Sequence, residues 1–150
     1  MANNFRTNFY LTQVSDSLFR YSITTHKGDW RGAQVHKFGW SFQNSLIPVC
    51  MKGKKEGKLS VSQSFCEVDK PNVLLLTLKQ AEDGEGLIVR LIEIEGKNTD
   101  VKVTLPFFTI VRAYRTNLVE ENERILSAKK HEIKVPVKAF DIATIRVQGI

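Results

Sequence analysis

Two apolar runs, Val73–Gln80 and Leu87–Ile94, constrain the fold of this chain more than any other feature. Their sequences, VLLLTLKQ and LIVRLIEI, are short and rich in branched side chains, and a polar, glycine-containing stretch at Glu82–Gly86 separates them. Such runs bounded by turn residues are typical of buried strands, and Asp83-Gly84 between them favours a hairpin. Because both faces of this predicted ribbon are apolar, other parts of the protein must cover both.

Short apolar or alternating segments recur along the rest of the chain, with polar turns between them. We predict further strands over Phe5–Leu11, Leu18–Thr24, Leu46–Met51, Leu59–Phe65, Val101–Leu105, Phe107–Tyr114, Glu132–Val137 and Phe140–Gln148, and a polar connection over Thr116–Glu123. The stretch Gly28–Asn44 is predicted as a turn or short helix, capped by Asp29, that runs into a strand containing Phe38, Trp40 and Phe42. About ten short strands in total predict an all-β fold, an antiparallel β-sandwich.

Composition narrows the classes of protein to consider. The chain is 42% apolar and 25% charged, as soluble globular proteins are. No apolar run approaches the ~20 residues of a membrane span, and the N-terminus has no signal-peptide pattern, so we expect no membrane partner. The two cysteines, Cys50 and Cys66, form no disulfide framework and predict a reducing, cytoplasmic location.

Motifs for catalysis or metal binding are missing from the sequence. His26, His36 and His131 lie far apart without metal-ligand spacing, so we predict no metal site. Nothing distinguishes the loop carboxylates from solvated ones, and no nucleophile elbow or phosphate-binding loop is present, so we assign no catalytic residue. The lysines of the connection Lys52–Lys58 are read as a solvated loop, and no nucleic-acid partner is expected.

Arg90 is the most informative single residue. It is the one charge within the apolar run Leu87–Ile92, and burial of an unpaired guanidinium is costly. One interpretation is an internal ion pair with Glu93, Glu95 or Glu121. The other is a contact that reaches into a ligand pocket or a domain interface.

Three segments together resemble a known family. They are EDGEGLIVRLIEIE at Glu82–Glu95, TNLVEE at Thr116–Glu121 and FDIATIRV at Phe140–Val147. In this order they resemble the C-terminal region of glycoside hydrolase family 38, the α-mannosidases, with Asp141 in place of the usual glutamate and Ile145 in place of the usual leucine.

A fourth segment adds to the resemblance. Phe19–Trp30, FRYSITTHKGDW, is similar to the family's strand that ends in a histidine-glycine-aspartate-tryptophan turn, with Thr25 where a proline is common. The resemblance therefore covers most of the chain.

The resemblance implies a part of a larger enzyme. Residues 1–51 would be the tail of a larger β-sandwich, residues 59–150 a small C-terminal β-sandwich, and residues 52–58 the linker. The partner would be a catalytic barrel of the same polypeptide, which carries the carboxylate nucleophile and a zinc or other divalent metal and hydrolyses terminal α-linked mannose. This chain itself would hold no cofactor and would be inactive alone. Apolar surface exposed without the barrel would allow a homo-oligomer.

A free-standing carbohydrate-binding or protein-interaction sandwich is the alternative function. An aromatic ring with polar groups beside it is what a mannose-containing carbohydrate would need. His26, Asp29, Trp30 and Trp40 offer such groups, so we name His26, Asp29, Trp30 and Arg90 as candidate ligand or interface contacts.

Overall fold

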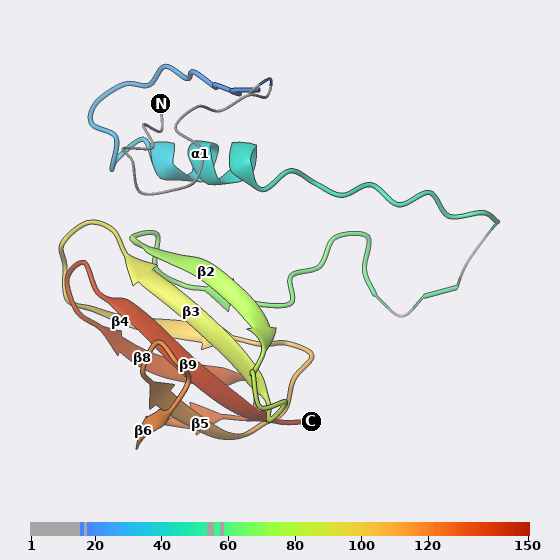
Figure 1. The fold of residues 1–150 in the computed structure, drawn as a ribbon, viewed down its shortest axis with the longest axis vertical. Coiled ribbons are helices and arrows are strands. Elements are labelled where there is room, and N and C mark those ends of the chain that lie inside the picture. Colours follow the sequence, from blue (N-terminus) through green and yellow to red (C-terminus); the bar gives the residue numbers. More distant parts are fainter. Residues whose placement is uncertain (1–15, 17, 54–55, 58) are drawn as a thin grey trace, which may run out of the picture. The chain divides into compact units, whose positions relative to one another are not determined.

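The computed structural model describes residues 16, 18–53, 56–57 and 59–150, and the chain divides into two compact units, Met1–Pro48 and Val49–Ile150 (Figure 1). The predicted strand Phe5–Leu11 lies outside the described residues, as do Lys54, Lys55 and Lys58 of the predicted linker. The assignment of residues 1–51 to a larger sandwich therefore stays a prediction. In the described part of the chain, no helix has the length and apolar character of a membrane span.

The described residues of the N-terminal unit contain one helix, α1, at Val35–Gln43. The predicted turn precedes it: the Asp29 carboxylate accepts the backbone N–H of Gly32 at 2.7 Å, and the Asp29 carbonyl accepts that of Ala33 at 3.1 Å. The predicted strand through Phe38, Trp40 and Phe42 is wrong, because these residues lie in α1. Their two-residue alternation coexists with a helical spacing, since Val35, Phe38 and Phe42 are three and four residues apart.

Three other predicted strands are also wrong. Leu18–Thr24, Leu46–Met51 and Leu59–Phe65 form no strand in the described residues. A strand requires a neighbour that pairs with its N–H and C=O groups, and the described residues provide none for these segments. Their apolar side chains stay in solvent, as the 91% exposure of Ile23 and the 96% exposure of Leu46 show.

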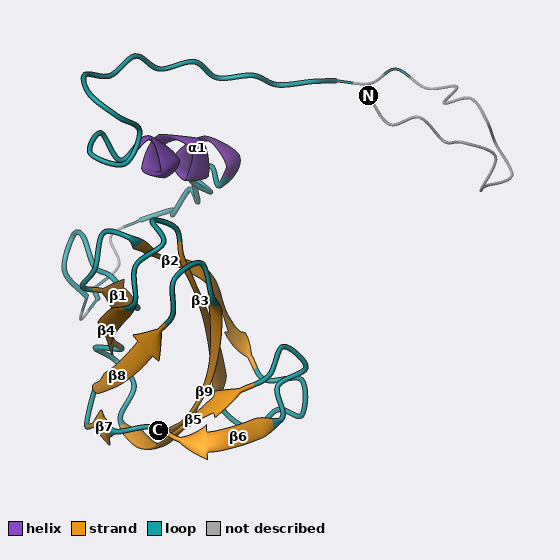
Figure 2. Cartoon of the chain, turned by 90° about the vertical axis from the view of Figure 1, so that its left-hand side faces the viewer, coloured by secondary structure: helices purple, strands orange, loops and turns teal. Residues whose placement is uncertain are grey.

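The C-terminal unit is an antiparallel β-sandwich, which confirms the predicted fold class (Figure 2). One sheet has the order β1-β4-β8-β7 and the other β2-β3-β9-β5-β6, and every pairing is antiparallel. The strands are β1 (Glu67–Val68), β2 (Val73–Gln80), β3 (Leu87–Glu93), β4 (Thr99–Thr104), β5 (Ile110–Thr116), β6 (Asn122–Ile125), β7 (Ala128–Lys129), β8 (Glu132–Val137) and β9 (Ile142–Gly149).

The strands match the sequence-based expectations closely in this unit. β2 and β8 have the predicted bounds, and β3 and β2 form the predicted hairpin. Three strands were missed. β6 begins inside the segment predicted as a polar connection and none of its side chains is buried, while β1 and β7 have two residues each, too few to show a pattern. β2 lies at the edge of its sheet, and a bulge at Leu76 interrupts its pairing with β3 between Leu75 and Thr77.

The core lies between the two sheets. Its centre consists of side chains that are at most 1% exposed, including Val89, Leu91, Val101, Val135 and Ile145. The pairing register places Ile88, Arg90 and Ile92 of β3 opposite Arg146, Thr144 and Ile142 of β9. Since side chains alternate along a strand, these six residues lie on the outer face of the larger sheet. Ile88 is fully buried there but Ile142 is 40% exposed, so the described residues cover this face only in part.

Candidate functional site

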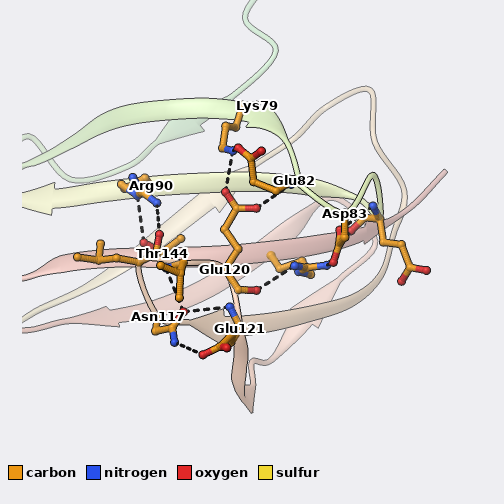
Figure 3. Close-up of polar contacts among 12 residues, drawn as sticks. Lys79, Glu82, Asp83, Arg90, Asn117, Glu120, Glu121 and Thr144 are labelled. Atoms are coloured by element: carbon orange, nitrogen blue, oxygen red, sulfur yellow. Dashed lines mark hydrogen bonds and ion pairs between the residues drawn. The ribbon is translucent and has the colours of Figure 1, made fainter.

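A group of charged and polar side chains gathers on the outer face of the larger sheet (Figure 3). We call it the outer cluster; its residues are Lys79, Glu82, Asp83, Arg90, Asn117, Glu120, Glu121, Thr144 and Arg146. Lys79 lies one residue before the end of β2, and Glu82 and Asp83 follow that strand. Arg90 comes from β3, and Thr144 and Arg146 come from β9. The loop Asn117–Glu121, which joins β5 to β6, supplies the rest. Five separate stretches of the chain thus meet at one place.

Arg90 is bound by neutral oxygens. Its Nε donates to the hydroxyl of Thr144 at 3.2 Å, and its Nη2 donates to the carbonyl of Leu118 at 3.0 Å. The carboxylate partner proposed among Glu93, Glu95 and Glu121 is not found in the described residues. Arg90 instead connects the sheet to the loop that lies over it.

Arg146 has the ion pair that the sequence argument expected for Arg90. Its side chain is 7% exposed, and it forms an ion pair with Asp83 in the β2–β3 turn. Its Nη2 also donates to the carbonyl of Glu120 at 2.9 Å. The two terminal nitrogens thus have a carboxylate and carbonyl partners, while the buried Nε has no hydrogen-bond partner among the described residues. Arg146 therefore joins β9 to the β2–β3 turn and to the loop that follows β5.

Glu120 is the anion at the centre of the outer cluster. It is 5% exposed, and its carboxylate forms an ion pair with Lys79 at 2.7 Å and accepts the backbone N–H of Glu82 at 2.9 Å. Lys79 also forms an ion pair with Glu82. The hydrogen bond from Lys79, followed by that from Glu82, holds the pKa of Glu120 below its ordinary value. In return, the hydrogen bonds to Glu120 and then Glu82 raise the pKa of Lys79.

The charge states of these groups determine what the outer cluster can do. The hydrogen bond from Arg146 lowers the pKa of Asp83, so both Asp83 and Glu120 stay ionised and paired near neutral pH. A glycosidase general acid needs a raised carboxyl pKa instead. The arrangement therefore suits a rigid scaffold, and not proton transfer.

The loop Asn117–Glu121 is held rigidly and displays two apolar side chains. The Asn117 side-chain oxygen accepts the backbone N–H groups of Val119 and Glu121 at 3.1 and 3.0 Å, and Glu120 has a positive φ of 70°. Leu118 and Val119 are nevertheless 60% and 74% exposed. A loop fixed by polar contacts with an apolar tip is a suitable contact surface for another domain.

A second buried carboxylate, Glu93, lies at the end of β3 and is 1% exposed. Its Oε1 accepts the Asn72 side-chain amide at 2.9 Å and the Glu95 N–H at 2.8 Å. Its Oε2 accepts three backbone N–H groups, from Gly96, Lys97 and Phe140, at 2.8, 3.1 and 2.9 Å. Burial alone raises the pKa of Glu93, but these hydrogen bonds, led by that of Phe140, outweigh it and lower the pKa to about 2.

The other predicted contacts lie in the N-terminal unit. His26 is exposed, and Asp29 is used in the turn before α1. The Trp30 ring is 41% exposed, with the guanidinium of Arg31 4.5 Å from its centroid, so a cation covers one face of the ring. Trp40 is in α1. His26, Asp29 and Trp30 are close in sequence, and Arg90 belongs to the other unit.

Sequence reasoning missed Arg146, Glu120 and Glu93. Arg146 was detectable, because it is the lone charge in the apolar run of β9, as Arg90 is in β3. Glu120 and Glu93 carry no such signal, since acidic residues beside turns are usually solvated. Among the described residues, no three or more histidine, cysteine or acidic side chains are grouped as a metal site would need.

Comparison with known proteins shows which family this chain resembles. Residues 72–145 match the family described as "Glycosyl hydrolases family 38 C-terminal beta sandwich domain". The chain is also similar to "Alpha-mannosidase G" of Dictyostelium discoideum, at 28% identity over 133 residues, which cover 85% of this chain and 12% of that protein. The matched residues run from just before β2 into β9. The chain therefore belongs, through residues 72–145, to the family of C-terminal β-sandwich domains of glycosyl hydrolases family 38.

Proposed function

We propose that this chain is the non-catalytic C-terminal part of an α-mannosidase, a glycosidase acting on terminal α-linked mannose. In this role it packs against a catalytic barrel of the same polypeptide and flanks its substrate cleft. The barrel, and not this chain, would hold the nucleophile and the zinc or other divalent metal. The outer cluster supports a scaffold role, because its buried carboxylate, that of Glu120, is paired with Lys79 and has a lowered pKa.

The observation that carries the proposal is the exposure of apolar side chains in N-terminal segments whose sequences are typical of strands. Leu18–Thr24 alternates apolar and polar residues, and Leu46–Met51 is almost entirely apolar. Their apolar side chains are nevertheless exposed, Leu18 by 87% and Ile47 by 88%. Alternation of this kind suits a strand with one covered face. Additional strands from a longer polypeptide would complete such a sheet, and the mannosidase relative is long enough to supply them, since this chain matches only 12% of it.

Localisation is part of the same proposal. Cys50 and Cys66 are free thiols, which is the usual state of cysteines in a reducing compartment such as the cytoplasm. We therefore place the protein there.

Two measurements test the proposal. The purified chain, incubated with 4-nitrophenyl α-mannoside with and without zinc, should release no nitrophenol, while an α-mannosidase that has its barrel serves as positive control. Metal-dependent hydrolysis of this mannoside by the chain would refute the proposal. An immunoblot of source-cell extract should show a band several times larger than 17.1 kDa. A band at 17.1 kDa would instead favour a free-standing module.

A further inference from the structure

An open cleft lies at one end of the sandwich and shares no lining residue with the outer cluster. Its volume is about 630 Å³, and it is bordered by the start of β4, the end of β8, the end of β5 and the strand β6. Both sheets therefore contribute to it. Small-molecule sites in proteins usually have volumes of roughly 300–1,000 Å³, so the cleft has the size of a ligand site.

Arg115 forms the fixed part of this cleft. Its side chain is 13% exposed, and Nη2 pairs with the Asp141 carboxylate at 2.9 Å. Nη1 donates to the carbonyl of Pro136 at 3.4 Å, and Nη2 also donates to that of Ile142 at 3.3 Å. A guanidinium has five N–H donors, and Nε has no partner among the described residues. Arg115 is thus held in place with donor capacity left over.

Arg124 makes the arrangement unusual. It pairs directly with Arg115 across β5 and β6, and both residues line the cleft. Two like charges opposite one another in a sheet destabilise it, so the stability of the sandwich does not explain the pair. In the described residues Arg124 has no ion-pair or hydrogen-bonded partner, whereas an oxygen-rich ligand between the two guanidinium groups would accept from both.

The balance of charge in the lining identifies the kind of ligand. The cations are Arg115, Arg124 and Lys138, and the anions are Asp100, Glu123 and Asp141. Their formal charges sum to zero, so an anionic ligand attracted by the arginines would be repelled by the carboxylates. Hydroxyl groups both accept from cations and donate to carboxylates.

We propose that this cleft binds a neutral polyhydroxylated ligand, namely a sugar unit. Arg115 and Arg124 donate to hydroxyl oxygens, and Asp100 and Glu123 accept from hydroxyl groups. The exposed ring of Pro136 provides an apolar surface for the C–H groups of the sugar. Because four of the six charged residues that line the cleft are exposed, we expect weak binding, with a dissociation constant of roughly 1–10 mM.

The test is a titration of the full ¹⁵N-labelled chain, followed by backbone amide shifts in NMR. Methyl α-mannoside should produce saturable shifts at Thr99, Asp100, Arg124 and Lys138. The choice of a mannoside depends on the proposed function, so methyl α-glucoside is titrated as well to test the cleft without that assumption. Saturable shifts at these residues with either sugar support the site.

Variants make the test specific to the cleft. Arg124→Gln should weaken sugar binding about tenfold, since it removes one charged donor. The matched control Arg112→Gln changes an exposed arginine of β5 outside the cleft and should leave binding unchanged. No saturable shift with either sugar up to about 50 mM, unaltered binding by Arg124→Gln, or saturation by inorganic phosphate in place of sugar would each overturn the proposal. None of these results would affect the non-catalytic role, which is tested by turnover and polypeptide size.

Discussion

Replacement of Glu93 by glutamine is expected to remove a large, pH-dependent part of the stability of the sandwich. Its carboxylate accepts five hydrogen bonds, four of them from backbone N–H groups. Glutamine has one acceptor oxygen and would turn its NH₂ toward some of these donors. The pKa of Glu93 falls from 4.5 to about 2, and a shift of one unit corresponds to about 1.4 kcal/mol, so the ionised form gains about 3 kcal/mol on folding.

The sign of the pH dependence follows from the direction of this shift. Because the pKa is lower in the folded state than in the unfolded state, the contribution is fully present above the unfolded value of 4.5 and is lost as the pH falls toward about 2. Urea unfolding of the natural chain and of Glu93→Gln at several pH values measures it. We expect a difference of about 3 kcal/mol at pH 7 that shrinks steadily below pH 4.5.

A control separates this effect from general acid sensitivity. Glu132→Gln removes an exposed carboxylate whose one ion pair, with Lys102, spans 3.2 Å, and should change stability by less than about 0.5 kcal/mol. A difference between the natural chain and Glu93→Gln that is below about 1 kcal/mol at pH 7, or equally large at pH 3, would refute the reasoning.

Three further predictions concern single positions. Arg146→Met should lower the free energy of unfolding by about 2–3 kcal/mol in urea titrations, because the carbonyl of Glu120 and the carboxylate of Asp83 lose their donor. A loss below about 0.5 kcal/mol would contradict a stabilising role of Arg146. Gly86→Ala should destabilise the protein by at least about 2 kcal/mol, because the φ of Gly86 is 92° and the new methyl group would collide with a β9 carbonyl. Gly84→Ala is the control and should cost about 1 kcal/mol, because Gly84 has a φ of 79° but no close neighbour. Equal melting temperatures of the two variants would refute the role of the collision. Burial, and then the charge of Glu67, raise the pKa of Cys66 to about 11. At pH 8 the Cys66 thiol should therefore react with a disulfide reagent far more slowly than the exposed thiol of Cys50, and equal reaction rates would contradict this prediction.

The C-terminal sandwich was predictable because its strands pair with one another. β2 and β8 have alternating or continuous apolar runs whose neighbours are in the same chain, so local pattern and tertiary structure agree. The N-terminal strands were not realised for the opposite reason: the alternation of Leu18–Thr24 indicates a covered face, but the described residues supply no cover. For α1 the error lay in the period, because Val35, Phe38 and Phe42 fit a helix as well as Phe38, Trp40 and Phe42 fit a strand.

The candidate site was predictable only in part. The lone charge of Arg90 within an apolar run led us to expect a carboxylate partner or a ligand or interface contact; the structure shows a hydroxyl and a carbonyl partner instead, and the contact stays a prediction. The partners could not be read from the sequence, because they come from the loop Asn117–Glu121 and from β9, some 28 and 54 residues away. The ion pair assigned to Arg90 belongs to Arg146, and only the pairing register between β3 and β9 distinguishes the two.

The bulge at Leu76 has a consequence for how copies of this chain meet one another. In the described residues β2 pairs only with β3, so its other side presents a row of free backbone groups of the kind that a strand of a second molecule pairs with. An extra residue in the strand bends that row and increases its twist, which opposes the close approach of a second strand. Deletion of Leu76 would straighten the edge, and the resulting protein would form intermolecular sheets and aggregate while its core stayed intact.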